Sequence, residues 1–132
     1  LYGFVALFIF TLAYMCSNEV KQRCVQRLQQ ADKHNDTGRR NIIDSSVFKN
    51  CSGLTSVTIP NSVTFIGSGA FSGCAWLDKI YYQGTAEDWN KIDISSNNDK
   101  LTSATRYYYS AEKPTASGNY WHYKENGEIE EW

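Results

Sequence analysis

Residues 43–59 read IDSSVFKNCSGLTSVTI, and residues 66–82 read IGSGAFSGCAWLDKIYY. The two stretches align without a gap at an offset of 23 residues, and hydrophobic side chains coincide at six positions. These pairs are Ile43 and Ile66, Phe48 and Phe71, Cys51 and Cys74, Leu54 and Leu77, Val57 and Ile80, and Ile59 and Tyr82. Six matches at one offset indicate an internal repeat, which predicts a fold built from stacked turns of the chain.

Each copy of the repeat combines a short strand with a tight bend. Residues 54–59 end in the alternation of a strand with one buried face. Pro60 then ends the strand, because it has no N–H for the ladder. In the second copy, the small residues 67–70 allow a sharp turn before Phe71 fills the interior. One turn cannot bury its apolar side alone, so the strands within 54–59 and 77–82 are predicted to be adjacent and parallel, about 4.8 Å apart.

The repeat also fits a known pattern. A period of 23 residues falls within the roughly 20–29 residues of leucine-rich repeats. The pattern I-G-x-x-A-F-x-x-C-x-x-L-x-x-V-x-I-P, most clearly carried by residues 57–63 and 66–74, resembles the BspA-like leucine-rich repeats of bacterial surface proteins. The resemblance covers about residues 43–132, since three aromatic-rich segments look like the C-terminal end of such proteins. These segments are 81–89, 104–110 and 120–123. The first copy departs from the pattern at Asp44 and Val47, where Gly and Ala are usual.

This resemblance implies both a fold and a class of function. The fold is an α/β leucine-rich-repeat solenoid, mostly β, with short parallel strands, an aromatic C-terminal cap and an N-terminal helix. The function is that of a non-catalytic, adhesin-like module, secreted or on the cell surface, which binds other proteins. Host matrix or surface proteins are the partners that the resemblance implies.

The repeat divides the chain into four parts. They are an apolar segment at 1–16, an amphipathic helix and linker at 17–41, two 23-residue repeats at 42–88, and a C-terminal cap with a β-hairpin at 89–132. As a helix, the uncharged first segment would extend about 24 Å, short of the roughly 30 Å hydrocarbon core. It is therefore interpreted as a signal-like or anchor-like segment, with a buried apolar helix as the alternative. A membrane contact is expected only through residues 1–16, if they are retained.

Residues 18–33 have the spacing of an amphipathic helix. Val20, Cys24 and Leu28 recur at i, i+4 and i+8, and basic and amide side chains fill the other face. The basic face is interpreted as solvated, with contact to anionic lipid head groups as the alternative. A polar stretch at 34–38 is expected to end this helix.

The C-terminal part has the pattern of a cover for the end of the repeats. Thr85-x-x-Asp88 resembles a capping box and predicts a short helix. Asn97-Asn98-Asp99 predicts a turn, residues 106–109 a strand, and residues 120–132 a β-hairpin. Large aromatic side chains cover much apolar area, so the cluster from Tyr107 to Tyr123 is interpreted as a cap. The alternative is a cell-wall carbohydrate-binding module in which these rings stack on sugars.

The strand face turned away from the core offers the candidate partner-binding residues. By alternation these are Ser56, Thr58, Lys79 and Tyr81. Lys79 and Tyr81 are expected to contribute most of the affinity, because aromatic residues are frequent hot spots; the alternative is a bare solvated face. Two repeats offer less than the roughly 800 Å² per partner of a stable interface, so binding is expected to be weak. Since about three repeats are normally needed for stability, the open repeat edge also predicts self-association.

Residues that carry other chemistry are sparse. The balance of 13 basic and 14 acidic residues, with a net charge of −1, argues against a nucleic-acid partner. There is no G-x-S-x-G motif, and neither His34 nor His122 lies near a pair of cysteines in the sequence. The sequence therefore predicts no catalytic residues, no metal site and no cofactor.

Cys51 and Cys74 occupy the same position of the repeat. Neighbouring turns bring such positions to about 4.8 Å, within the roughly 4.4–6.8 Å between Cα atoms that a disulfide needs. Two buried thiols are the favoured interpretation, and a disulfide between them is the alternative.

Overall fold

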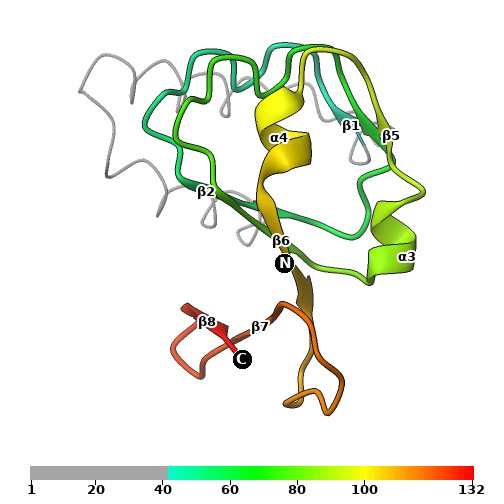
Figure 1. The fold of residues 1–132 in the computed structure, drawn as a ribbon, viewed down its shortest axis with the longest axis vertical. Helices are drawn as coiled ribbons and strands as arrows, with labels where there is room; N and C mark the ends of the chain where they lie inside the picture. The colour runs from blue at the N-terminus through cyan, green and yellow to red at the C-terminus, as the bar shows by residue number, and fades with distance from the viewer. Residues whose placement is uncertain (1–41) are drawn as a thin grey trace.

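A computed structural model describes residues 42–132, which stack as turns of the chain with a hairpin at the C-terminal end (Figure 1). The apolar segment 1–16 and the amphipathic helix expected at 17–41 lie outside the described residues. Within the described part, no helix is long and apolar enough to cross a membrane.

Residues 42–132 form two sheets. The smaller sheet has the order β1-β3-β5 and is entirely parallel. Its strands are β1 (Ile42–Ile43), β3 (Phe65–Ile66) and β5 (Asp93–Ile94). The larger sheet has the order β2-β4-β6-β7-β8, parallel except for the antiparallel pair β7 and β8. Its strands are β2 (Ser56–Ile59), β4 (Lys79–Tyr82), β6 (Thr105–Tyr109), β7 (Tyr120–Tyr123) and β8 (Ile129–Glu131).

The register of the larger sheet follows the period of the sequence. Val57 pairs with Ile80 and Ile59 with Tyr82, so residues 23 apart lie side by side on parallel strands. The prediction of adjacent, parallel strands within 54–59 and 77–82 is confirmed. An antiparallel hairpin between them would have contradicted the repeat.

A third turn of the chain follows the two repeats that the sequence shows. It contains α3 (Ala86–Trp89), β5, α4 (Asp99–Ser103) and β6. β5 extends the smaller sheet and β6 the larger one, so this segment belongs to both sheets as well as lying in the part expected to be a cap. Ile80 pairs with Arg106, which is 26 residues later, and Ile66 pairs with Ile94, which is 28 residues later. The segment with α3 is therefore five residues longer than its counterpart in the repeat and the segment with α4 two residues shorter, so the 23-residue pattern does not reveal this turn.

The predicted helix at Thr85 is present. The Thr85 side chain accepts a hydrogen bond from the backbone N–H of Asp88, and the Asp88 carboxylate accepts one from the N–H of Thr85, which completes a capping box. The helix places Trp89 in the interior, where its ring meets that of Tyr82 edge-on at 5.3 Å between centroids.

The core lies between the two sheets and repeats from turn to turn. Phe48 and Phe71 stack with their ring centroids 4.9 Å apart. Side chains at the repeat positions are buried, among them Ile59, Ile66, Ile80 and Tyr82. The residues matched in the sequence are therefore the residues that stack.

Backbone hydrogen bonds join the bends of neighbouring turns. The N–H of Phe48 donates to the carbonyl of Ala70 at 2.8 Å, and the N–H of Gly69 donates to the carbonyl of Ser96 at 2.9 Å. Gly67 allows this close approach, because a Cβ at that position would collide with the backbone of Ser45. The bends are thus held against each other by the main chain and tolerate little extra volume.

The two repeat cysteines differ in their chemistry. The buried Cys74 thiol donates to the carbonyl oxygen of Phe48 at 3.2 Å. Cys51 is disulfide-bonded, and not to Cys74. The interpretation as two buried thiols is therefore correct for Cys74 and wrong for Cys51, whose state depends on a partner that the repeat alignment does not identify.

Candidate functional site

The outer face of the larger sheet carries the side chains that alternate with the core. Val57, Ile59 and Ile80 belong to the core, so the residues between them point to the opposite side of their strands. In one row across the strands, Ser56 lies beside Lys79 and Lys79 beside Thr105. In the next row, Thr58 lies beside Tyr81 and Tyr81 beside Tyr107. All four predicted binding residues therefore lie on one face, in two adjacent rows.

Glu131, at the end of β8, reaches across this face to β4. Its Oε1 lies 2.6 Å from the Lys79 Nζ and accepts a hydrogen bond from the Tyr81 hydroxyl at 2.7 Å. Lys79 also lies over the Tyr107 ring, with its Nζ 5.4 Å from the centroid. One carboxylate oxygen thus joins the two residues from which the sequence predicts the greatest affinity.

The contact shifts the pKa values of Glu131, Lys79 and Tyr81. Burial acts to raise the pKa of the Glu131 carboxyl, but hydrogen bonds, from Lys79 first and then Tyr81, outweigh it and bring the pKa below its ordinary value of 4.5. The hydrogen bond to Glu131 raises the pKa of Lys79 above 10.5. Burial, and after it the bond to Glu131, raises the pKa of Tyr81. At neutral pH the contact is therefore an ion pair reinforced by a neutral phenol.

Aromatic rings cover the rest of this face beside the hairpin. We call the set Tyr81, Tyr107, Tyr109, Trp121 and Tyr123 the outer aromatic cluster. Tyr81 contacts Tyr107 at 5.4 Å and Trp121 at 5.7 Å between ring centroids. Trp121 also meets Tyr109 edge-on at 5.3 Å and Tyr123 edge-on at 4.7 Å. Edge-to-face rings at these distances are a favourable packing arrangement.

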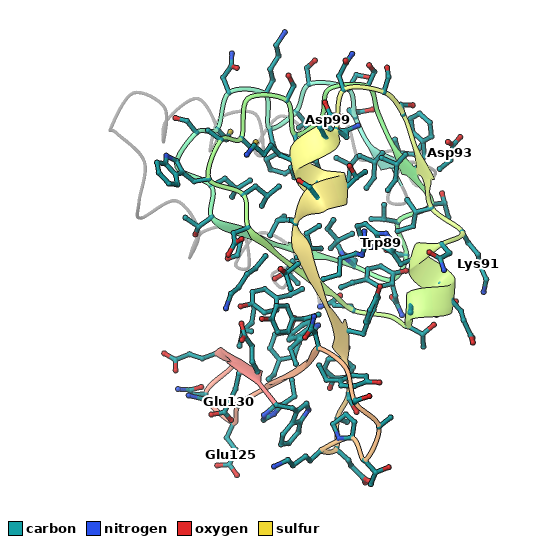
Figure 2. All side chains as sticks on the ribbon, in the orientation of Figure 1. Trp89, Lys91, Asp93, Asp99, Glu125 and Glu130 are labelled. Atoms are coloured by element: carbon teal, nitrogen blue, oxygen red, sulfur yellow. The ribbon has the colours of Figure 1, made fainter. Side chains whose placement is uncertain are left out.

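Trp121 anchors the hairpin on the sheet. Its side chain is fully buried, and its Nε1 donates to the carbonyl oxygen of Tyr82 at 2.9 Å. Nearby, the Gln83 amide donates to the Tyr123 hydroxyl at 2.7 Å. Side chains fill the space between the hairpin and the turns of the chain (Figure 2). This arrangement favours the interpretation of the aromatic residues as a cap, because their rings pack on each other.

The last residue closes the hairpin at its outer side. The Trp132 ring stacks on His122 with 3.8 Å between centroids, and its Nε1 donates to the carbonyl oxygen of Ser110 at 2.8 Å. The backbone N–H of Trp132 donates to the carbonyl of Tyr120 at 3.0 Å. The main chain next to Glu131 is therefore fixed, which directs the Glu131 side chain over the sheet.

The structure gives the four predicted residues different surroundings. Ser56 and Thr58 lie on β2, half-buried, with no residue of β8 described as bonded to them. Lys79 is partly exposed, whereas Tyr81 is 9% exposed beneath the outer aromatic cluster. Sequence analysis did not identify Glu131 or Tyr107 as part of this face. The alternation within β6 places Tyr107 outward, but its register against Tyr81 depends on the longer third turn.

The comparison with protein families agrees with this architecture. A family model described as "BspA type Leucine rich repeat region (6 copies)" matches residues 18–102, more than half of the chain. The chain belongs to the BspA-type leucine-rich repeat family. The resemblance is thereby confirmed over residues 43–102, and the family match begins further upstream, at residue 18. It also reaches past the two visible repeats into the third turn, where β5 and most of α4 lie. Neither a curated protein nor a solved structure matches the chain significantly.

Membership of the family agrees with a β-rich repeat fold and with a repeat module for protein interaction. Among residues 42–132, no three His, Cys, Asp or Glu side chains gather in a way that would hold a metal ion. The outer face of the larger sheet, on which the four predicted binding residues lie in two rows, is the candidate functional site of the described residues.

Proposed function

We propose that this chain is a non-catalytic, adhesin-like interaction module of a secreted or cell-surface protein, with the solenoid form of its family. It binds other proteins through the outer face of the larger sheet. The observation that carries this proposal is that the side chains of that face lie in two rows across neighbouring strands. Ser56 and Thr58 lie outside the core and are half-buried, so a partner can contact them without disturbing the repeat packing.

The accessible part of the face is centred on β2. Ser56 and Thr58 are small and polar there, and Lys79 adds a positive charge beside Ser56. The family match continues upstream of β1 to residue 18, and each further repeat would add a strand on the β2 side. Additional strands enlarge the surface toward the roughly 800 Å² per partner of a stable interface.

Two features support a location outside the cytoplasm. The disulfide at Cys51 is typical of proteins that mature in an oxidising compartment. The uncharged apolar residues 1–16 fit a signal-like segment.

A binding experiment with matched arginine substitutions tests the proposal. The full chain is passed over immobilised extracellular-matrix proteins, as wild type, as Ser56→Arg and as Ser62→Arg. Ser62 is exposed in the turn after β2 and off the outer face, so its substitution serves as the control. Loss of binding in Ser56→Arg alone supports the outer face as the interface. Equal binding of all three proteins, or binding of none, contradicts it.

A second candidate function is the binding of cell-wall carbohydrate. The observation that favours it is the exposure of two rings near the hairpin: Tyr109 is 41% exposed and Trp132 is 42% exposed. A sugar stacking on Trp132 changes its fluorescence, so titration with soluble cell-wall fragments tests this function directly. A flat titration rejects it, and a saturable change favours it over protein binding.

A further inference from the structure

Glu131 places one carboxylate oxygen against both the Lys79 ammonium and the Tyr81 hydroxyl of β4. We propose that Lys79 and Tyr81 form a recognition site for an acidic segment of a partner protein, and that Glu131 holds this site closed from within the chain. This inference rests on the proposed function, and it names the partner chemistry and the regulation of the same face.

The site is built to hold one carboxylate. The Lys79 ammonium supplies the charge, and the Tyr81 hydroxyl supplies a second donor to the same oxygen, at 2.6 and 2.7 Å. Rings of the outer aromatic cluster hold the Tyr81 ring in place from two sides. The donors are therefore preorganised, and little ordering is required of them when a carboxylate arrives.

The occupant that the chain itself provides is an extended segment. Ile129 and Glu131 are two residues apart on β8 and thus face the same side of the strand. They pair with Tyr123 and Trp121 of β7, which belong to the outer aromatic cluster. A partner of the same chemistry is an extended segment that presents a carboxylate to Lys79.

The contact between Glu131 and Lys79 is weak enough for another carboxylate to replace Glu131. The side chains of Lys79 and Glu131 remain 38% and 34% exposed, and ion pairs with that much solvent contribute little. The backbone of β8 is fixed by its pairing with β7, but the Glu131 side chain can rotate away without breaking that pairing. A competing carboxylate can reach Lys79 from the β2 side, where the neighbouring residue in the row is the small Ser56.

A peptide taken from the chain's own C-terminus serves as the probe. The acidic hexapeptide GEIEEW, equivalent to residues 127–132, carries a fluorescent label, and GQIQQW is the neutral control peptide. Binding is measured by fluorescence anisotropy to three full-length proteins: wild type, Glu131→Ala and the double variant Glu131→Ala with Lys79→Met. Circular dichroism verifies that each protein is folded; if Glu131→Ala is not, Glu131→Gln replaces it in both variants.

The proposal predicts that Glu131→Ala binds the acidic peptide about fivefold more tightly than wild type, because the closed state no longer competes. It also predicts that the double variant loses this gain and that the neutral peptide shows none. Equal affinity of the three proteins, no binding by any of them, or a gain that survives Lys79→Met would overturn it. Dimerisation of Glu131→Ala in size-exclusion chromatography would also overturn the partner assignment, because the occupant would then be a second copy of the chain.

The two proposals fail separately. Binding to matrix proteins that depends on Ser56, combined with a negative peptide experiment, retains the proposed function and removes the carboxylate site. A peptide response that depends on Lys79, without any matrix binding, retains the site and removes that class of partner.

Discussion

Replacement of Asn98 by Ala is expected to loosen the third turn from the second. Asn98 is the one polar residue that is fully buried within 42–132, and its side chain does not cap the helix that follows it. Instead, Oδ1 accepts the backbone N–H of Phe71 at 3.0 Å, and Nδ2 donates to the carbonyl of Gly67 at 3.0 Å and to that of Ser95 at 2.9 Å. One amide therefore joins the bends of two successive turns.

The magnitude follows from the groups left behind. In Asn98→Ala, the N–H of Phe71 loses its acceptor and the carbonyl of Gly67 loses its side-chain donor, in a bend that leaves no room for solvent beside Phe71. A buried polar group without a partner costs about 1–3 kcal/mol. The Gly67 carbonyl keeps the backbone N–H of Ala70 at 3.2 Å, so the expected loss in the free energy of unfolding is about 1–3 kcal/mol, which lowers the melting temperature by roughly 5–10 °C in a protein of this size.

Urea and thermal denaturation followed by circular dichroism measure this loss. The matched control is Asn119→Ala, since the Asn119 side chain is exposed in the loop before β7 and its removal is expected to change stability by less than about 0.5 kcal/mol. If Asn98→Ala is as stable as Asn119→Ala, the amide does not join the turns, and the pairing of β5 and β6 alone holds the third turn on the second.

Three other predictions concern the hairpin, the bends and the core. Because the folded-state pKa of Glu131 lies below its ordinary value of 4.5, its contribution to stability is present above that pH and is lost as the pH falls through the lower value. Glu131→Gln should remove this pH dependence, which amounts to at most about 1 kcal/mol for so exposed a pair in urea titrations at neutral and acidic pH. Gly73→Ala should lower the free energy of unfolding by about 1–2 kcal/mol because of its positive φ of 75°, and by more because the Asn50 carboxamide must move. Gly127→Ala is the control for the backbone cost alone, since Gly127 has a φ of 82° and open space around it. Equal losses of stability in the two variants would contradict the packing argument. The buried Cys74 thiol should react with iodoacetamide only after unfolding, and peptide mapping that finds it modified in the native protein would show that the core opens locally.

The sequence allows the two 23-residue turns to be predicted because their bends have equal length. Left-handed residues recur at the same places in both, at Ser46 and Gly69 and again at Asn50 and Gly73, so the hydrophobic positions stay in phase. In the third turn, Asn97 adopts the same conformation as Ser46 and Gly69, but the longer segment that contains α3 displaces it from the 23-residue register. A search for a fixed period therefore ends one turn too early.

The outer face of the larger sheet shows a different limit of prediction from the sequence. Strand alternation correctly places Ser56, Thr58, Lys79 and Tyr81 outside the core. Alternation within one strand does not indicate which segment covers the face, because that depends on how the hairpin bends back from β6. Two residue pairs join β6 to β7, and nothing in their sequence specifies that Glu131 will reach β4.

The outward side chains change steadily along the larger sheet. On β2 they are Ser56 and Thr58, on β4 they are Lys79 and Tyr81, and on β6 they are Thr105, Tyr107 and Tyr109. Small polar side chains leave a strand face open to a partner, whereas adjacent aromatic rings provide apolar area on which a hairpin can pack. The face therefore passes from the proposed binding surface to the base of the hairpin, and β4 is the strand on which the two meet. The contact of Glu131 with that strand lies at the border between the two parts, because aromatic rings cover Tyr81 whereas Ser56 and Thr58 on β2 are only half-buried.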